Sequence, residues 1–204
     1  GTKPLALWLS EPNVFIMKDV DVRTPDDLNG LKIRVSGSAA AAAVEALGAT
    51  PVQMPAGEIY NSLQTGLIDG VITGASAIGD FKLDEVANSY TLNAPLGHIS
   101  FYVVMNQAKY DSMPDDLKKI LDDNTGAEFS AYAGKTMAGY DAAGRGIAEA
   151  TDNEIVVLDE AEVERWKAIA ETVRDNWFDE MDAKGMDGEA LYAKAQELIA
   201  KYTK

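Results

Sequence analysis

One segment of the chain, residues 31–38, reads Leu31-Lys32-Ile33-Arg34-Val35-Ser36-Gly37-Ser38. Its first five residues alternate apolar side chains with cations, which is the pattern of a buried strand. The polar Ser36-Gly37-Ser38 and the alanine-rich run after it predict that the strand passes into a helix, with Ser38 as the N-cap. A strand that leads directly into a helix is the building unit of α/β proteins.

The residues on either side extend this pattern through the first half of the chain. Short apolar runs predict strands, and amphipathic runs between them predict helices. The elements that we expect are strands at 5–9, 14–17, 31–35, 50–54, 71–73 and 99–105, and helices at 38–47 and 57–65. A turn at Ser10-Glu11-Pro12-Asn13 is expected between the first two strands. The alternation of strand and helix from residue 31 to residue 73 indicates parallel βαβ units.

The second half of the chain has mainly helical patterns. Ser112 is expected to cap a helix that begins near Asp115, and a long helix is expected from about Ala127 to Ala150, with glycines that allow a bend or close packing. After a strand at 155–158, Asp159 is expected to open a further helix. Its apolar residues recur at helical spacing and are interpreted as core: Val163, Trp166, Ala170, Val173, Trp177 and Met181. The last helix, near 189–202, is expected to pack through Leu191, Ala195 and Leu198.

Composition argues against several classes of function. A net charge of −15 without a basic stripe disfavours nucleic-acid binding. The absence of cysteine, with His98 as the single histidine, leaves no ligand set for a transition metal, and we expect neither metal nor cofactor. The sequence lacks a nucleophile elbow, a phosphate-binding loop and a dinucleotide fingerprint, so we do not expect an enzyme. No apolar run is long enough to span a bilayer.

Arg34 is the leading candidate for a binding residue. A guanidinium at the carboxyl end of such a strand lies near the crevice in which open α/β sheets bind ligands. Arginine suits a carboxylate because its rigid fork donates two parallel charge-assisted hydrogen bonds. The alternative is that Arg34 is a structural partner of one of the many acidic residues. Asn13 and His98, which are polar residues beside strands, fit a structural hydrogen bond and a ligand contact equally well.

Several further motifs accompany Arg34 along the chain. They are Gly30–Val35, Ala46–Val52, Glu58–Gly70, Tyr102–Asn106 and Met113–Lys119. In this combination, which runs nearly from end to end, the sequence resembles the DctP-type solute-binding proteins of tripartite ATP-independent periplasmic (TRAP) transporters.

The resemblance implies an α/β, periplasmic-binding-protein-like fold that closes as a two-lobe clamp. This chain would supply the second lobe, the connecting strands and the long helix. The implied division is an α/β ligand-binding lobe at 1–98, an inter-lobe strand, helix and long connecting helix at 99–150, and a strand and C-terminal helices that pack on the lobe at 151–204. The segment that builds most of the family's first lobe has no counterpart before Gly1, so we expect a trimmed or partial chain.

The resemblance also assigns site positions. The family's ligand-clamping arginine falls on Arg34, and its polar position on the preceding crossing strand falls near Asn13. The loop after the Asp-Gly pair, which contacts the ligand, falls on Gly74 to Ser76, and a polar position on the inter-lobe strand falls near His98. The expected ligand-binding residues are therefore Arg34, Asn13, Gly74, Ser76 and His98. The loop lacks the asparagine and the tryptophan of other members, so their specificities do not carry over.

The implied function is capture of a small organic carboxylate in the periplasm and its delivery to the TRAP membrane subunits for ion-gradient-driven uptake. The sequence does not identify the organic acid. Two alternatives stay open: an α/β enzyme that acts on a carboxylate, and a non-binding fragment that forms a homodimer through its long helix.

Overall fold

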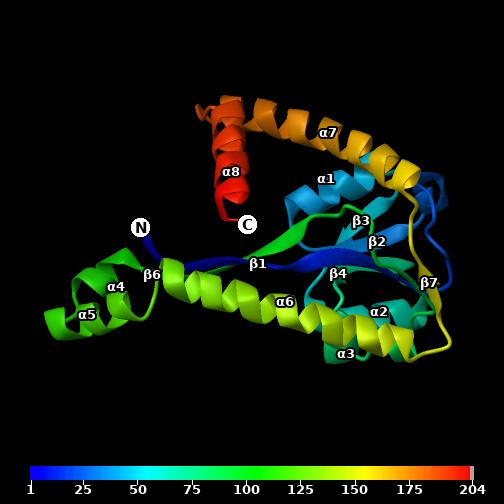
Figure 1. Ribbon diagram of the computed structural model, residues 1–204, viewed down its shortest axis with the longest axis horizontal. Coiled ribbons are helices and arrows are strands. Elements are labelled where there is room, and N and C mark those ends of the chain that lie inside the picture. The colour runs from blue at the N-terminus through cyan, green and yellow to red at the C-terminus, as the bar shows by residue number, and fades with distance from the viewer. Residues whose placement is uncertain (203–204) are drawn as a thin grey trace.

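The computed structural model describes residues 1–202, and seven strands within them form one mixed sheet (Figure 1). The strand order is β3-β2-β4-β1-β5-β7, and β6 pairs with β1 outside this path. The strands are β1 (Thr2–Met17), β2 (Lys32–Val35), β3 (Thr50–Gln53), β4 (Gly70–Gly74), β5 (Ser89–Thr91), β6 (His98–Asn106) and β7 (Glu154–Val156). Strands β2, β3 and β4 are mutually parallel, which confirms the predicted βαβ units, whereas β1 runs antiparallel to β4 and β5.

Helices cover both faces of this sheet. The helices of the described residues are α1 (Ser38–Ala46), α2 (Ile59–Thr65), α3 (Ala77–Asp80), α4 (Gln107–Asp111), α5 (Asp115–Asp123), α6 (Ala127–Glu149), α7 (Glu160–Ala183) and α8 (Gly188–Tyr202), of which α4, α5 and α8 lie away from the sheet faces. Figure 1 shows α1 and α7 on one side of the sheet and α2, α3 and α6 on the other. Single 3-10 turns occur at Pro25–Leu28, Ala56–Glu58 and Leu83–Glu85.

The alternation of side chains along β1 divides the core between these two sides. Phe15 belongs to the apolar cluster that also holds Trp166 of α7, whereas Val14 and Ile16 belong to the cluster that holds Ile78 of α3. All of these side chains are almost fully buried. Successive residues of a strand point to opposite faces, so one central strand serves both halves of the core.

The predicted turn at Ser10–Asn13 is wrong, because these residues belong to one continuous strand of 16 residues. The outer half of β1 pairs with β6, and its inner half pairs with β4 and β5. Between Leu9 and Pro12 the pairing register of β1 with β6 shifts, which marks a β-bulge. The residues that resemble a turn in the sequence lie at this bulge. Pro12 is tolerated there because a bulge does not need every backbone N–H in the ladder.

Beyond the core, the outer halves of β1 and β6 form a ribbon along which α6 packs. Large apolar side chains on this ribbon are exposed, Leu7 at 61% and Tyr102 at 66%. An isolated two-stranded ribbon is at best marginally stable in water. The ribbon therefore depends on α6 for support within the described residues.

Helix α6 packs against the backbone of the loop after β4 at Gly144. A Cβ atom at this position would lie 2.1 Å from the carbonyl oxygen of Ala75, in the loop after β4. At Gly139 and Gly146 of the same helix a Cβ would meet nothing within 4 Å. The expected close packing is therefore confirmed at Gly144, and this contact fixes the helix against the loop that follows β4.

The C-terminal helices differ from the expectation. Asp159 caps α7 by accepting a hydrogen bond from the Glu162 backbone N–H at 2.9 Å, as predicted. Of the predicted core stripe only Trp166 is fully buried, and Ala170 is exposed. The reason is that α7 passes over α1 and then runs beyond the sheet, where α8 folds back from its far end (Figure 1).

Three finer expectations are also wrong. Leu191 and Leu198 of α8 are 48% and 40% exposed, so they do not form the expected packing face within the described residues. Gly37 and Pro114, in place of Ser38 and Ser112, occupy the N-cap positions of α1 and α5. A serine near the start of a helix is a weak predictor of the N-cap position. The residue before or after it can occupy that position instead when its backbone has the required non-helical conformation.

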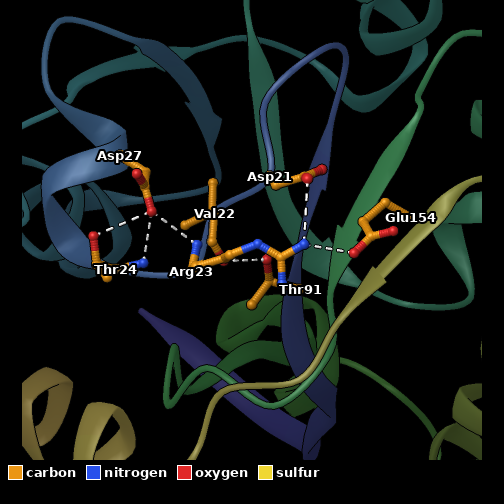
Figure 2. A network of polar contacts seen from close by, with 7 residues as sticks. All are labelled: Asp21, Val22, Arg23, Thr24, Asp27, Thr91 and Glu154. Carbon is orange, nitrogen blue, oxygen red and sulfur yellow. Dashed lines mark hydrogen bonds and ion pairs between the residues drawn. The ribbon is translucent and has the colours of Figure 1, made fainter.

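The loop after β1 is tied to the far edge of the sheet through Arg23 (Figure 2). Its Nη2 atom lies 2.5 Å from a carboxylate oxygen of Glu154 in β7 and 3.3 Å from one of Asp21. Thr91 of β5 also donates a hydrogen bond to the carbonyl of Val22, at 2.7 Å. These contacts link segments that are far apart in the sequence and attach β7 to the lobe.

Asp27 organises the same loop at the start of the first 3-10 turn. Its Oδ2 atom accepts hydrogen bonds from the backbone N–H groups of Arg23 (3.0 Å) and Thr24 (2.7 Å) and from the Thr24 hydroxyl (3.1 Å). Partial burial raises the pKa of Asp27, but the backbone hydrogen bonds outweigh it and hold the pKa below its ordinary value of 3.8. The charged carboxylate therefore stabilises the folded state.

Replacement of Gly144 by alanine should destabilise the chain by about 1–3 kcal/mol, because the new methyl group collides with backbone that cannot easily move. The matched control is Gly139→Ala on the same helix, which should stabilise the chain by up to ~1 kcal/mol through helix propensity. Urea denaturation of both variants measures the difference. Equal effects of the two substitutions would contradict the proposed close contact.

The Asp27→Ala variant should lose about 1 kcal/mol of stability at pH 6, where the native carboxylate is charged. Because the folded-state pKa is depressed, this contribution is present above pH 3.8 and is lost as the pH falls through the lower folded-state pKa. The stabilities of the variant and the native chain should therefore converge as the pH falls through the folded-state pKa of Asp27, and Asp84→Ala serves as the control. A difference that stays constant with pH would show that the hydrogen bonds to the carboxylate are not responsible.

Candidate functional site

Arg34 lies near the carboxyl end of β2 with its side chain turned into the protein. The residue is only 6% exposed, and its Nε and Nη2 atoms donate to the carbonyl oxygen of Met54 at 3.1 and 2.9 Å. Burial lowers the pKa of the guanidinium from its ordinary value. Within residues 1–202 no carboxylate forms an ion pair with it. The structural partner of Arg34 is thus a carbonyl group and not an acid.

This arrangement differs sharply from that of Arg23. The Arg23 side chain is 54% exposed and contacts two carboxylates (Figure 2), so its charge is neutralised by the protein and by water. Arg34 has no such ion pair within the described residues and is only 6% exposed. Removing a charged group from water without a counter-ion is unfavourable, and the Nη1 atom of Arg34 has no hydrogen bond within the described residues. The guanidinium can therefore accept an anionic partner.

A cavity of about 300 Å³ adjoins Arg34. It opens where the carboxyl ends of β2 and β4 meet the start of β6, which is the edge at which α/β sheets bind ligands. Its polar lining consists, besides Arg34, of Ser10, Glu11, Ser36, Thr73, Ser76 and Asp80, and the backbone of Gly74 lies among them. Its apolar lining consists of Ala56, Ala77, Phe81, Ile99, Phe101 and Met137. The cavity thus combines one buried cation with a mainly apolar wall.

Three of the five predicted site residues, Arg34, Gly74 and Ser76, line this cavity. Asn13 and His98 instead line a neighbouring hollow of about 580 Å³ beside the start of α1. Asn13 shares its strand face with Phe15, whereas Arg34 points to the opposite face of the sheet. The structure therefore separates the predicted residues into two adjacent groups, and Ser36 and Ile99 line both hollows.

The hydrogen bonds of Asn13 and His98 are largely structural. The Asn13 side chain is buried and donates to the carbonyl of Leu96 at 3.3 Å, while its Oδ1 atom has no partner within the described residues. The Nδ1 atom of His98 lies 2.8 Å from the carbonyl oxygen of Ser10. A carbonyl can only accept, so Nδ1 carries the proton, and this bond holds the bulge of β1 against β6.

Glu11 is the buried charged residue of this cavity that sequence reasoning missed. It is only 2% exposed, and its Oε1 atom accepts a hydrogen bond from the backbone N–H of Ser76 at 3.1 Å. The available signal was a single acid between two apolar strand segments, but the expected turn at 10–13 placed it in solvent. The β-bulge turns Glu11 into the interior instead.

No group of three or more His, Asp or Glu side chains within residues 1–202 is arranged to hold a metal ion. In the same part of the chain, no helix combines the length and the apolar character needed to cross a membrane. The site therefore consists of a buried guanidinium, a buried carboxylate, the exposed carboxylate of Asp80, several hydroxyl groups and apolar side chains. Such a set can bind and orient a small organic molecule.

Residues 1–181 match the family model described as "Bacterial extracellular solute-binding protein, family 7". The C4-dicarboxylate-binding periplasmic protein DctP of Rhodobacter capsulatus is 29% identical over 187 residues, which cover 90% of this chain and 55% of that protein. The chain thus spans a little more than half the length of this relative.

Solved structures agree with this assignment. A TRAP solute-binding protein from Rhodoferax ferrireducens, in complex with copurified benzoate, matches with a TM-score of 0.94 at 35% identity, over 99% of this chain and 64% of that one. A marine-metagenome TRAP solute-binding protein specific for aromatic acids, in complex with 3-hydroxybenzoate, matches with a TM-score of 0.92 at 32% identity, over 99% of this chain and 64% of its own. These matches confirm the expected fold.

The family model matches most of the chain, and the solved structures agree with it in fold. The chain therefore belongs to family 7 of the bacterial extracellular solute-binding proteins, a family of binding proteins and not of enzymes.

Proposed function

We propose that the complete protein is the solute-binding component of a TRAP transporter and captures a small organic carboxylate at Arg34. The observation that carries the proposal is the buried guanidinium, which lines a cavity and has no carboxylate partner within the described residues. A ligand carboxylate would supply the missing negative charge and accept charge-assisted hydrogen bonds. Such bonds contribute about 1.5–3 kcal/mol each.

The wall of the cavity supports a ligand with an apolar body. Phe81 follows α3, Phe101 lies on β6 and Met137 lies on α6, and these three side chains line the cavity beside Arg34, which has space for a ring or an alkyl chain. Ligand pockets commonly combine such a wall with a few polar groups that set the orientation. Two solved relatives were found with benzoate and with 3-hydroxybenzoate, which are acids of this kind.

We also propose that further residues cover the exposed side of the cleft. The relatives have longer chains, and the apolar ribbon of β1 and β6 has a face exposed to solvent within the described residues. Residues corresponding to that additional length would bury this face and exclude water from the bound acid. In this proposal residues 1–98 form the ligand-binding lobe, residues 99–150 connect the lobes, and residues 151–204 supply the strand and the C-terminal helices that pack on the ligand-binding lobe.

The clamp would act in the periplasm, where it would deliver the acid to the TRAP membrane subunits. The periplasmic relative named above supports this location. Uptake would then be driven by an ion gradient across those subunits and not by this chain. A homodimer through the long helix is not needed for this role, because the cavity is built within a single chain.

Replacing Arg34 should abolish most of the affinity of the full-length protein for its organic acid. Arg34→Ala removes both charge-assisted hydrogen bonds, and we expect Kd to rise about 100-fold or more. Arg34→Lys should also lose most of the affinity, because a point charge cannot reproduce the planar fork. Isothermal titration calorimetry with the best acid from a thermal-shift screen measures both values.

The matched control is Arg23→Lys, which changes a guanidinium in the same lobe that is already paired with the protein's own acids. This variant should bind the acid with unchanged affinity. Normal affinity of Arg34→Ala, with its fold intact by circular dichroism, would rule out the proposed role of Arg34.

A further inference from the structure

The carboxylate of Glu11 is held in the binding cavity by features of three separate elements. The Ser10 hydroxyl accepts a hydrogen bond from the Ile99 backbone N–H at 2.9 Å and donates one to the Glu11 carbonyl at 2.6 Å, which fixes the bulge. The backbone N–H of Ser76 then binds Oε1 of Glu11. The bulge in β1, the pairing with β6 and the loop after β4 together place this one side chain.

Gly74 provides the space in which that carboxylate lies. A Cβ atom at this position would come within 2.3 Å of Oε1 and 2.4 Å of the carboxyl carbon of Glu11. Any residue other than glycine would therefore push the carboxylate out of its place. Gly74 and Ser76, which we expected as direct ligand contacts, thus position Glu11 in this structure.

The carboxylate is nevertheless incompletely satisfied. Its Oε2 atom is buried and has no hydrogen-bond partner within the described residues. A carboxylate can accept about four hydrogen bonds, and a buried polar atom without a partner destabilises the protein. Arg34, which lines the same cavity, does not pair with Glu11. The cavity is therefore lined by one cation, Arg34, and by two carboxylates, the buried Glu11 and the exposed Asp80, and Arg34 pairs with neither of them within the described residues.

A simple carboxylic acid would satisfy only the cation. Its negative charge would bind Arg34, but its apolar body would leave Oε2 of Glu11 without a donor. From these contacts we infer that Glu11 determines specificity by accepting a hydrogen bond from a hydroxyl or ammonium group on the ligand. The ligand class is then an organic acid whose apolar body carries such a donor. This inference rests on the proposed function of the site.

The inference predicts a preference that calorimetry on the full-length protein can measure. The probes are benzoate against the 2-, 3- and 4-hydroxybenzoates and 3-(aminomethyl)benzoate, and succinate against malate. At least one acid with a donor should bind about tenfold or more tightly than its parent acid, because the site's carboxylate is unpaired without it. Comparison of the hydroxyl and ammonium probes identifies which donor is preferred.

Two variants test whether Glu11 is responsible. Glu11→Gln keeps the size of the side chain but removes its charge, and Gly74→Ala displaces the carboxylate. Each should reduce the preference for the donor-bearing acid about five- to tenfold, because a neutral or misplaced acceptor forms a weaker bond. Glu45→Gln, on the exposed surface of α1, is the control and should keep the full preference. Thermal unfolding curves check that each variant is folded.

The outcomes separate the inference from the proposed function. Equal affinities within every pair of acids, or an unchanged preference in a folded Glu11→Gln protein, would overturn the role of Glu11 while leaving Arg34 as the carboxylate site. If no probe binds, or if Arg34→Ala weakens the binding of none of them, the proposed function is wrong and the inference fails with it.

Discussion

Placing a guanidinium inside a protein without a counter-ion is unfavourable, and this lobe does so at Arg34. The side chain is held in place by the carbonyl of Met54, which orients the fork without neutralising its charge. The remaining donor capacity is directed toward a cavity at the carboxyl edge of the sheet. Binding of an anion beside Arg34 would offset the electrostatic penalty of burying its charge.

The rest of the fold serves to position this site. A single long strand, β1, passes through the middle of the sheet and continues as the ribbon with β6, so that one bulge lies between the core and the ribbon. The bulge turns Glu11 into the cavity, and Gly144 lets α6 pack directly against the loop that carries Ser76. The cavity beside Arg34, the ribbon and the long helix are therefore linked by direct contacts.

Sequence patterns located the sheet, the parallel units and the buried cation, because strand alternation and the position of Arg34 depend on local chemistry. They did not locate Glu11, since a proline flanked by polar residues normally indicates a turn and the bulge depends on pairing with a distant strand. They placed Asn13 beside Arg34 because the face of a strand cannot be assigned until its register is known. Helical periodicity likewise identified α7 and α8 but not what their apolar faces contact.

The most direct measurement of this account is a crystal structure of the full-length protein with its organic acid bound. We expect both oxygens of the ligand's carboxylate to lie within hydrogen-bonding distance of the Arg34 guanidinium, with the body of the acid against Phe81 and Phe101. A carboxylate bound elsewhere in the cleft, with Arg34 still contacting only the Met54 carbonyl, would contradict the account.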